Sequence, residues 1–173
     1  MEIKNILVGI DFDVNNTQLV QLSFELSKQL EAKLIFLHCY LPTQHDLDME
    51  QDDIDRKYLQ DLIMLIDPIG NMYNEVDYVF DVVSSFVVKG MVNYITESEV
   101  DLVIVGNKKN DSWIPVKSNS ISISEKSEIP TIIVPEDYRM TEINHVVFNI
   151  EFEFREIEKI YYCLLYTSPS PRD

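Results

Sequence analysis

Residues 101–135 read DLVIVGNKKNDSWIPVKSNSISISEKSEIPTIIVP and decide the fold class. Two short apolar runs, 102–105 and 131–134, frame a polar loop over 107–117 and a Ser- and Ile-rich segment, 118–127, that we expect to be helical. Continuous apolar runs, unlike alternating ones, are typical of strands buried on both faces. The stretch therefore predicts a strand, a long loop, a helix and a second strand, within a sheet that helices cover.

Three earlier apolar segments extend this pattern toward the N-terminus. Strands are expected at 6–10, 34–37 and 76–82, each followed by a helix. The strand–helix alternation predicts an α/β fold with an open, five-stranded parallel sheet and helices on both faces. Ligands bind beyond the carboxyl ends of the strands in such sheets. The segments that follow the predicted strands are Asp11, residues 38–40, residues 81–85 and Gly106 onward.

The helices are predicted from apolar residues that recur every three or four positions. Asn15 or Asn16 is expected to cap the first helix, which we place as far as Lys33. A polar, acidic loop over 42–53 precedes a helix at 54–66, which Pro68 and Gly70 are expected to end. The apolar residues at helical spacing are Leu19, Leu22, Leu26, Leu30, Tyr58, Leu62, Leu65, Val87, Met91 and Ile95.

The segment from Asp101 to Pro135 resembles the C-terminal half of universal stress protein domains, and NILVGIDFD at 5–13 resembles their first strand. The resemblance covers residues 1 to about 136. It implies an adenine nucleotide alpha hydrolase-like, Rossmann-like fold with strand order 3-2-1-4-5. It also implies self-association through the fifth strand, either between chains or with a second domain of the same chain.

The family motif G-x-x-G-x9-G-[ST] holds nucleotide phosphates, because glycines let backbone N–H groups approach the anion. It falls on Gly106, Lys109, Asn119 and Ser120, so the spacing is kept while Lys109 and Asn119 replace two glycines. Asn119 tolerates a left-handed backbone, Ser120 can donate its hydroxyl or cap the helix, and Asp11 matches the acid that contacts the nucleotide. The resemblance implies ATP, with Mg²⁺, or AMP as ligand. The alternative is a nucleotide-free domain that acts by protein association.

Two further features lie near the C-terminus. Residues 2–13 and 142–153 resemble each other at a constant offset of 140 residues, which indicates a duplicated unit. We therefore expect one domain at 1–137 and the truncated start of a second at 138–162, packed poorly or on a sheet edge. The segment 163–173 resembles a translated sequencing adapter, and it is left out of the fold prediction.

Two enzyme or signalling classes share part of the pattern. Haloacid-dehalogenase-type phosphatases open with D-x-D after a strand, as Asp11 and Asp13 do here, but they continue with Gly-Thr. A response-regulator receiver would use Asp11, Asp13 and Asp81, but it needs a Lys after strand five, where Val134-Pro135-Glu136 stands. Neither pattern is complete, so we expect no catalytic activity.

The formal net charge of −16 disfavours nucleic acids and anionic membranes as partners. No apolar run is long enough to span a bilayer, and no signal peptide is recognisable, so a cytoplasmic location is expected. Cys39 and Cys163 belong to no CxxC or Cys/His cluster, so the sequence predicts no zinc site.

Overall fold

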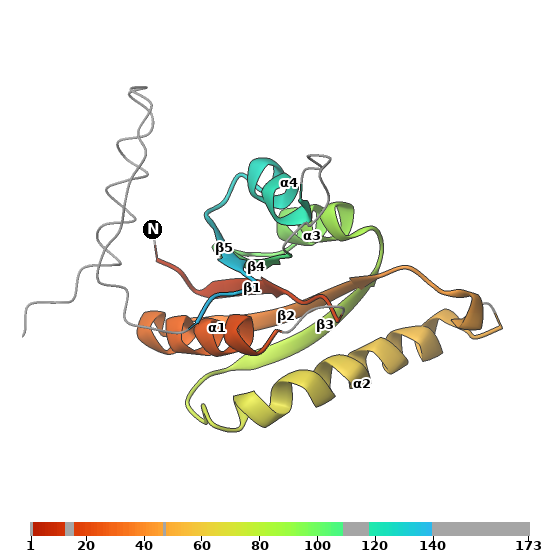
Figure 1. Ribbon diagram of the computed structural model, residues 1–173, viewed down its shortest axis with the longest axis horizontal. Coiled ribbons are helices and arrows are strands. Elements are labelled where there is room, and N and C mark those ends of the chain that lie inside the picture. Colours follow the sequence, from red (N-terminus) through yellow and green to blue (C-terminus); the bar gives the residue numbers. More distant parts are fainter. Residues whose placement is uncertain (1, 13–15, 47, 109–117, 140–173) are drawn as a thin grey trace, which may run out of the picture. The chain divides into compact units, whose positions relative to one another are not determined.

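The structure, a computed structural model, describes residues 2–12, 16–46, 48–108 and 118–139. They form an all-parallel sheet in the order β3-β2-β1-β4-β5, which confirms the predicted open α/β fold and its strand order (Figure 1). The strands are β1 (Asn5–Gly9), β2 (Lys33–Tyr40), β3 (Tyr78–Ser84), β4 (Leu102–Asn107) and β5 (Thr131–Pro135). The helices are α1 (Thr17–Leu30), the 3-10 helix η1 (Gln44–Asp46), α2 (Gln51–Gly70), α3 (Val87–Glu97) and α4 (Asn119–Lys126).

Helices cover both faces of the sheet, and each face has its own apolar core. Figure 1 shows α1 and α2 on one side and α3 and α4 on the other. Phe24 and Leu62 pack with Phe36 in the first core, whereas Met91 and Ile123 pack with Leu37 in the second. Neighbouring residues of β2 thus face opposite cores, as the alternation of side chains along a strand requires.

Strand β1 lies at the centre of the sheet, between β2 and β4. Gly9 at its end pairs in register with Leu37 of β2 and Val105 of β4. The chain leaves β1 toward one helical layer and β4 toward the other, so the loops after these two strands diverge. Such a divergence creates a crevice at the carboxyl edge, and this position fixes where the ligand site is expected.

Two helix ends differ from the sequence prediction. Helix α1 stops at Leu30 because Glu31 adopts a left-handed conformation with φ of 53°, so Lys33 begins β2 instead of ending the helix. Helix α2 begins earlier than predicted, at Gln51, and Pro68 lies inside it. Pro68 is exposed, so the helix loses one hydrogen bond on its water-facing side, where the freed carbonyl can bind solvent.

Gly70 does end α2, and packing explains why glycine stands there. A Cβ atom at Gly70 would lie 2.6 Å from the hydroxyl oxygen of Tyr78 and 3.1 Å from the ring of Phe24. The end of α2 can therefore approach β3 closely only without a side chain at this position.

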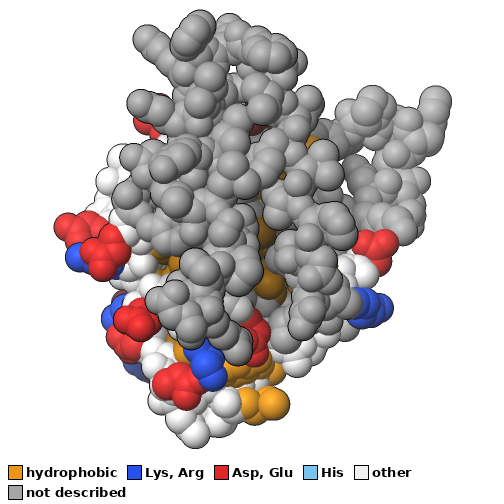
Figure 2. Space-filling model, turned by 90° about the vertical axis from the view of Figure 1, so that its left-hand side faces the viewer, with side chains coloured by type: hydrophobic (Ala, Val, Ile, Leu, Met, Phe, Trp, Pro, Cys, Tyr) orange, Lys and Arg blue, Asp and Glu red, His pale blue; other side chains and the backbone are white. Residues whose placement is uncertain are grey.

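The predicted second domain and the tail lie outside the described residues, except for residues 138 and 139. The boundary after residue 137, the placement of 138–162 and the origin of 163–173 therefore stay predictions. On the face in Figure 2, the visible acidic side chains are scattered, and the visible Lys and Arg side chains stand beside them. Among the described helices, none combines the length and apolarity that a membrane span needs.

Candidate functional site

A cavity of about 530 Å³ opens at the carboxyl edge of the sheet, where β1, β2 and β4 end. A volume of this size suits a small-molecule ligand. Loops and helix ends from both layers contribute to its wall. The lining residues that bear on which ligand the cavity can bind are Asp11, Phe12, His38, Cys39, Tyr40, Gly106, Asn107, Lys108, Asn119 and Ser120.

Gly106 lies in β4 at the wall of this cavity, and packing within the protein does not account for it. A Cβ atom built on Gly106 would have no atom of the described residues within 4 Å, in contrast to Gly9, whose Cβ would lie 3.1 Å from Met91 and Val105. A larger side chain at 106 would therefore enter open space in the cavity without disturbing the fold. The backbone here can be approached by a ligand, as the sequence predicts for the first glycine of the motif.

The sequence left open whether Ser120 caps α4 or offers its hydroxyl to a ligand, and the structure shows that Ser118 is the cap. Ser118 is the N-cap of α4, and its Oγ accepts a hydrogen bond from the backbone N of Ile121 at 3.4 Å. Ser120 is buried, and its Oγ donates to Oδ1 of Asn107 at 2.9 Å while lying 2.9 Å from Oγ of Ser118. Ser120 is therefore not the cap, and its hydroxyl ties the start of α4 to the end of β4.

Asn119 begins α4, and its backbone is helical. Among the described residues only Glu31 and Glu128 have positive φ, so the left-handed conformation suggested for Asn119 is not adopted. The side chain of Asn119 is exposed at the cavity wall, at the start of α4, where the N–H groups of Asn119 and Ser120 have no partner within the helix. Lys109, the other replaced glycine, lies outside the described residues, whereas Lys108 is an exposed part of the wall.

Two side-chain hydrogen bonds hold the turn after β1, which carries Asp11. Asn15 or Asn16 was expected to cap α1; Asn16 occupies the N-cap position, but its Nδ2 donates to the carbonyl of Asp11 at 2.7 Å and its side chain makes no capping bond to the helix. Nδ1 of His38 lies 2.9 Å from the carbonyl of Ile10. Because two successive carbonyls are bound, the backbone of the turn is fixed and Asp11 stays at the cavity wall.

Aromatic rings form the cavity wall on the β2 side, a feature that was not predicted from the sequence. The ring centroids of Phe12 and His38 are 4.0 Å apart, those of His38 and Tyr58 are 5.6 Å apart, and those of Tyr58 and Tyr40 are 4.1 Å apart. His38 and Tyr40 are two residues apart in β2 and therefore point to the same face of the sheet, and this spacing was the one signal of the row in the sequence. Tyr58 comes from α2 and joins this row only through the tertiary fold.

Neither Cys39 nor Tyr40 supplies an ionised nucleophile at neutral pH. Burial raises the pKa of the Cys39 thiol to about 11, so the sulfur stays protonated. Burial, together with a hydrogen bond from its hydroxyl to Asp55, raises the pKa of Tyr40 to about 12. The described residues also contain no cluster of three His, Cys, Asp or Glu side chains suited to a metal ion.

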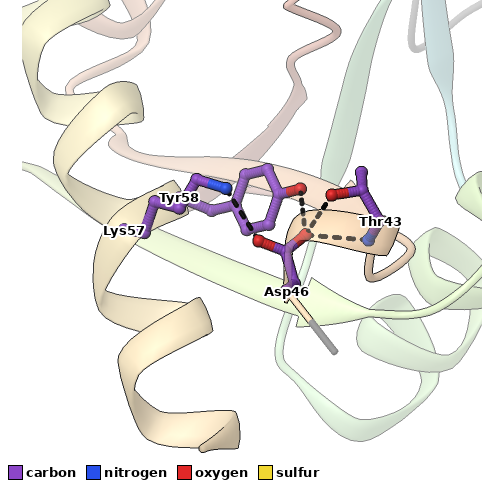
Figure 3. A network of polar contacts seen from close by, with 4 residues as sticks. All are labelled: Thr43, Asp46, Lys57 and Tyr58. Carbon is purple, nitrogen blue, oxygen red and sulfur yellow. Dashed lines mark hydrogen bonds and ion pairs between the residues drawn. The ribbon is translucent and has the colours of Figure 1, made fainter. Parts of the chain in front are cut away.

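A polar network that includes Tyr58 fixes the loop after β2 to α2 (Figure 3). The carboxylate of Asp46 is fully buried; Oδ1 lies 2.8 Å from Nζ of Lys57, and Oδ2 accepts from the backbone N and Oγ1 of Thr43. The Tyr58 hydroxyl also donates to Oδ2, at 3.4 Å. These donors, with Lys57 the largest contribution, hold the pKa of Asp46 well below its usual range. The network positions Thr43 and Tyr58, which both line the cavity.

The model of the universal stress protein family matches residues 2–135. The chain belongs to this family. The match includes the segments that carried the resemblance, from the first strand to the end of β5. No curated protein sequence matches the chain at a significant level.

Several solved universal stress proteins share the fold of this family member. One in complex with cAMP is 17% identical, with a TM-score of 0.59 over 79% of this chain and 100% of that one. UspA from Lactobacillus plantarum is 14% identical, with a TM-score of 0.61 over 78% of this chain and 99% of that one. A protein from Archaeoglobus fulgidus in complex with dAMP is 15% identical, with a TM-score of 0.53 over 78% of this chain and 99% of that one.

Proposed function

We propose that this universal stress protein domain binds an adenine nucleotide, ATP or AMP, in the cavity at the carboxyl edge of its sheet. The observation that carries the proposal is Gly106, whose missing side chain leaves open space at the wall where the end of β4 faces the start of α4. The fold and the cavity alone would suit many ligands. Two solved proteins with the same fold were determined with cAMP and dAMP, which supports an adenine nucleotide in particular.

The residues at the β4 end of the cavity fit a phosphate group. The first turn of α4 offers the backbone N–H groups of Asn119 and Ser120, which have no partner within the helix, and the positive end of the helix dipole. Lys108 lies in the same wall, and Ser120 can turn its hydroxyl from Asn107 to an anion. We propose Asn119 and Lys109 as further phosphate contacts. Asn119 lines the cavity, whereas Lys109 is proposed only because of its position in the motif. Asp11, in the turn after the neighbouring strand β1, would accept hydrogen bonds from the ribose hydroxyls.

Mg²⁺, if ATP is the ligand, would arrive on the triphosphate, because the described residues offer no ready-made metal cluster. We propose a binding role in the stress response of a cytoplasmic protein, without catalysis. The neutral Cys39 and Tyr40 side chains support this proposal.

Calorimetric titration of ATP with Mg²⁺, and of AMP, into the full chain tests the proposal. We expect micromolar binding that Gly106→Val abolishes and that Ser120→Ala weakens about tenfold, the effect of one hydrogen bond to a charged group. Ser122→Ala on the same helix is the control and should bind as the unchanged chain does. Circular dichroism should show that Gly106→Val still folds, because a Cβ atom at this position meets no atom in the part of the chain that the structure describes. Absence of heat at millimolar nucleotide would refute the proposal.

The outer edge of β5 supports a second function, self-association. Because the N of Val103 bonds the carbonyl of Pro130, and pairing alternates along a parallel ladder, the N–H of Ile132 faces β4 and that of Ile133 faces outward. No other described strand pairs with β5 on that side, so the edge can take a strand of a second domain or chain.

Ile133→Pro is expected to remove association through this edge without breaking the bonds between β5 and β4. Sedimentation velocity should show dimers of the unchanged chain and monomers of the variant. Ile132→Pro is the matched control, because it removes an N–H inside the sheet and should lower stability instead. Dimers that persist in a folded Ile133→Pro variant would exclude β5 as the interface.

A further inference from the structure

His38 presents a hydrogen-bonding atom to the cavity that the protein itself does not use. The residue is 8% exposed, and its Nδ1 lies 2.9 Å from the carbonyl oxygen of Ile10. A carbonyl oxygen only accepts hydrogen bonds, so Nδ1 must carry the proton. In the neutral ring, Nε2 is then a bare acceptor.

Nε2 has no partner among the described residues, yet it is not sealed in the core. Among the described residues, His38 makes one hydrogen bond, through Nδ1 to Ile10. Every buried side-chain nitrogen or oxygen in the described part of the chain has a partner, so an atom without one must be accessible. Nε2 therefore reaches the surface of the cavity that His38 lines. The rings of Phe12 and Tyr58 pack around the imidazole and limit its rotation. An acceptor so held, on a residue that is more than nine-tenths buried, is suited to a donor on a ligand.

The order of the strands indicates which part of a nucleotide lies at His38. Gly106 lies near the end of β4, and α4 is the helix that follows this strand. Asp11 follows β1, the neighbour of β4, and His38 lies in β2, on the other side of β1. Adjacent strands are about 4.8 Å apart, so the phosphate end and His38 are separated by roughly 10 Å. With phosphate at β4 and ribose at β1, the base falls at β2.

We propose that His38 selects the base of the ligand, with Nε2 accepting a hydrogen bond from the exocyclic amino group of adenine. This assignment rests on the proposed nucleotide site and adds its specificity. A 6-oxo purine presents a carbonyl oxygen at the same position, and two acceptors that face each other leave both without a hydrogen bond. Phe12, which packs on the same ring, adds an aromatic surface beside the base.

Three ligands and two variants test the assignment in the full chain. The ligands are AMP, purine riboside 5′-monophosphate, which lacks the 6-amino group, and IMP. We expect the unchanged chain to prefer AMP over each of the others by about tenfold, the effect of one hydrogen bond. His38→Asn keeps a donor near Nδ1 for the carbonyl of Ile10 but has no atom at Nε2, so it should bind all three equally. His45→Gln, at an exposed histidine in η1, should keep the preference.

A long-range ¹H–¹⁵N spectrum of the imidazole groups gives a second readout that needs no variant at position 38. His38 is assigned by elimination with His45→Gln and His145→Gln. We expect a ring protonated at Nδ1 in the free protein and a shift of Nε2 when AMP is added, but not when the analogue without the amino group is added.

The outcomes separate the base assignment from the proposed function. Nucleotides that bind with equal affinity to the unchanged chain and leave Nε2 unshifted would overturn the role of His38 and leave the site itself in place. A ring protonated at Nε2 in the free protein would overturn it as well. If none of the three nucleotides binds at millimolar concentration, the proposed function fails and the assignment fails with it.

Discussion

Phe24→Ala is expected to lower the free energy of unfolding by about 3–5 kcal/mol, the cost of removing a large aromatic side chain from a packed core. Phe24 is fully buried in α1. Its ring centroid lies 5.5 Å from that of Phe36, 5.0 Å from that of Tyr73 and 5.2 Å from that of Tyr78. Alanine would leave a cavity between α1 and the sheet that these rings cannot fill without leaving their own positions.

Urea unfolding followed by circular dichroism measures this difference, with Phe86→Ala as the matched control. Phe86 is 69% exposed, so its removal should change the free energy of unfolding by no more than about 0.5 kcal/mol. A loss below about 1.5 kcal/mol for Phe24→Ala would show that the core collapses around this position, or that Phe24 is not packed as described.

The strands could be predicted from the sequence because burial on both faces leaves a local signal. Apolar runs placed β1, β4 and β5 to within a residue or two of the observed strands. The strand order carries no such signal, since any parallel order satisfies the same apolar pattern. It followed from the family resemblance, and the structure confirms it.

Helix ends were predicted less well, for reasons particular to each residue. Proline usually ends a helix, but Pro68 stands on the exposed side of α2, where a missing hydrogen bond can be replaced by water. Asp52 and Asp53 look like loop residues, yet they occupy the first turn of α2, where acidic side chains interact favourably with the helix dipole.

The candidate site shows the same division between local and tertiary information. Gly106 and the motif spacing are local, and the structure brings Gly106, Asn119, Ser120 and Asp11 to one cavity. The motif could not indicate that Ser120 bonds Asn107, or that His38 bonds Ile10, because each pair joins separate elements. The sequence thus placed His38 only at the end of a predicted strand, and its unused Nε2 was not foreseen.

Lys57→Met is expected to lower stability far more than the same change at its neighbour, Arg56→Met. Both residues pair with an aspartate at 2.8 Å, but the partners differ in exposure: the Asp53 side chain is 52% exposed and that of Asp46 is 0% exposed. Losing an exposed pair changes the free energy of unfolding by no more than about 1 kcal/mol. Losing Lys57 leaves the Asp46 carboxylate in the interior without its cation, which is strongly destabilising. Equal midpoints for the two variants in urea would contradict this prediction.

The pH dependence of the same pair has a definite sign. The pKa of Asp46 is lowered in the folded state, so its contribution to stability is present above the ordinary aspartate value of about 3.9 and is lost as the pH falls below it. Lys57 is the largest cause of the lowered pKa, so the free energy of unfolding should fall less steeply with acid in Lys57→Met than in the unchanged chain. Arg56→Met should keep the steep fall. Parallel curves for Lys57→Met and the unchanged chain would mean that Thr43 and Tyr58 alone hold the Asp46 carboxylate in its ionised form.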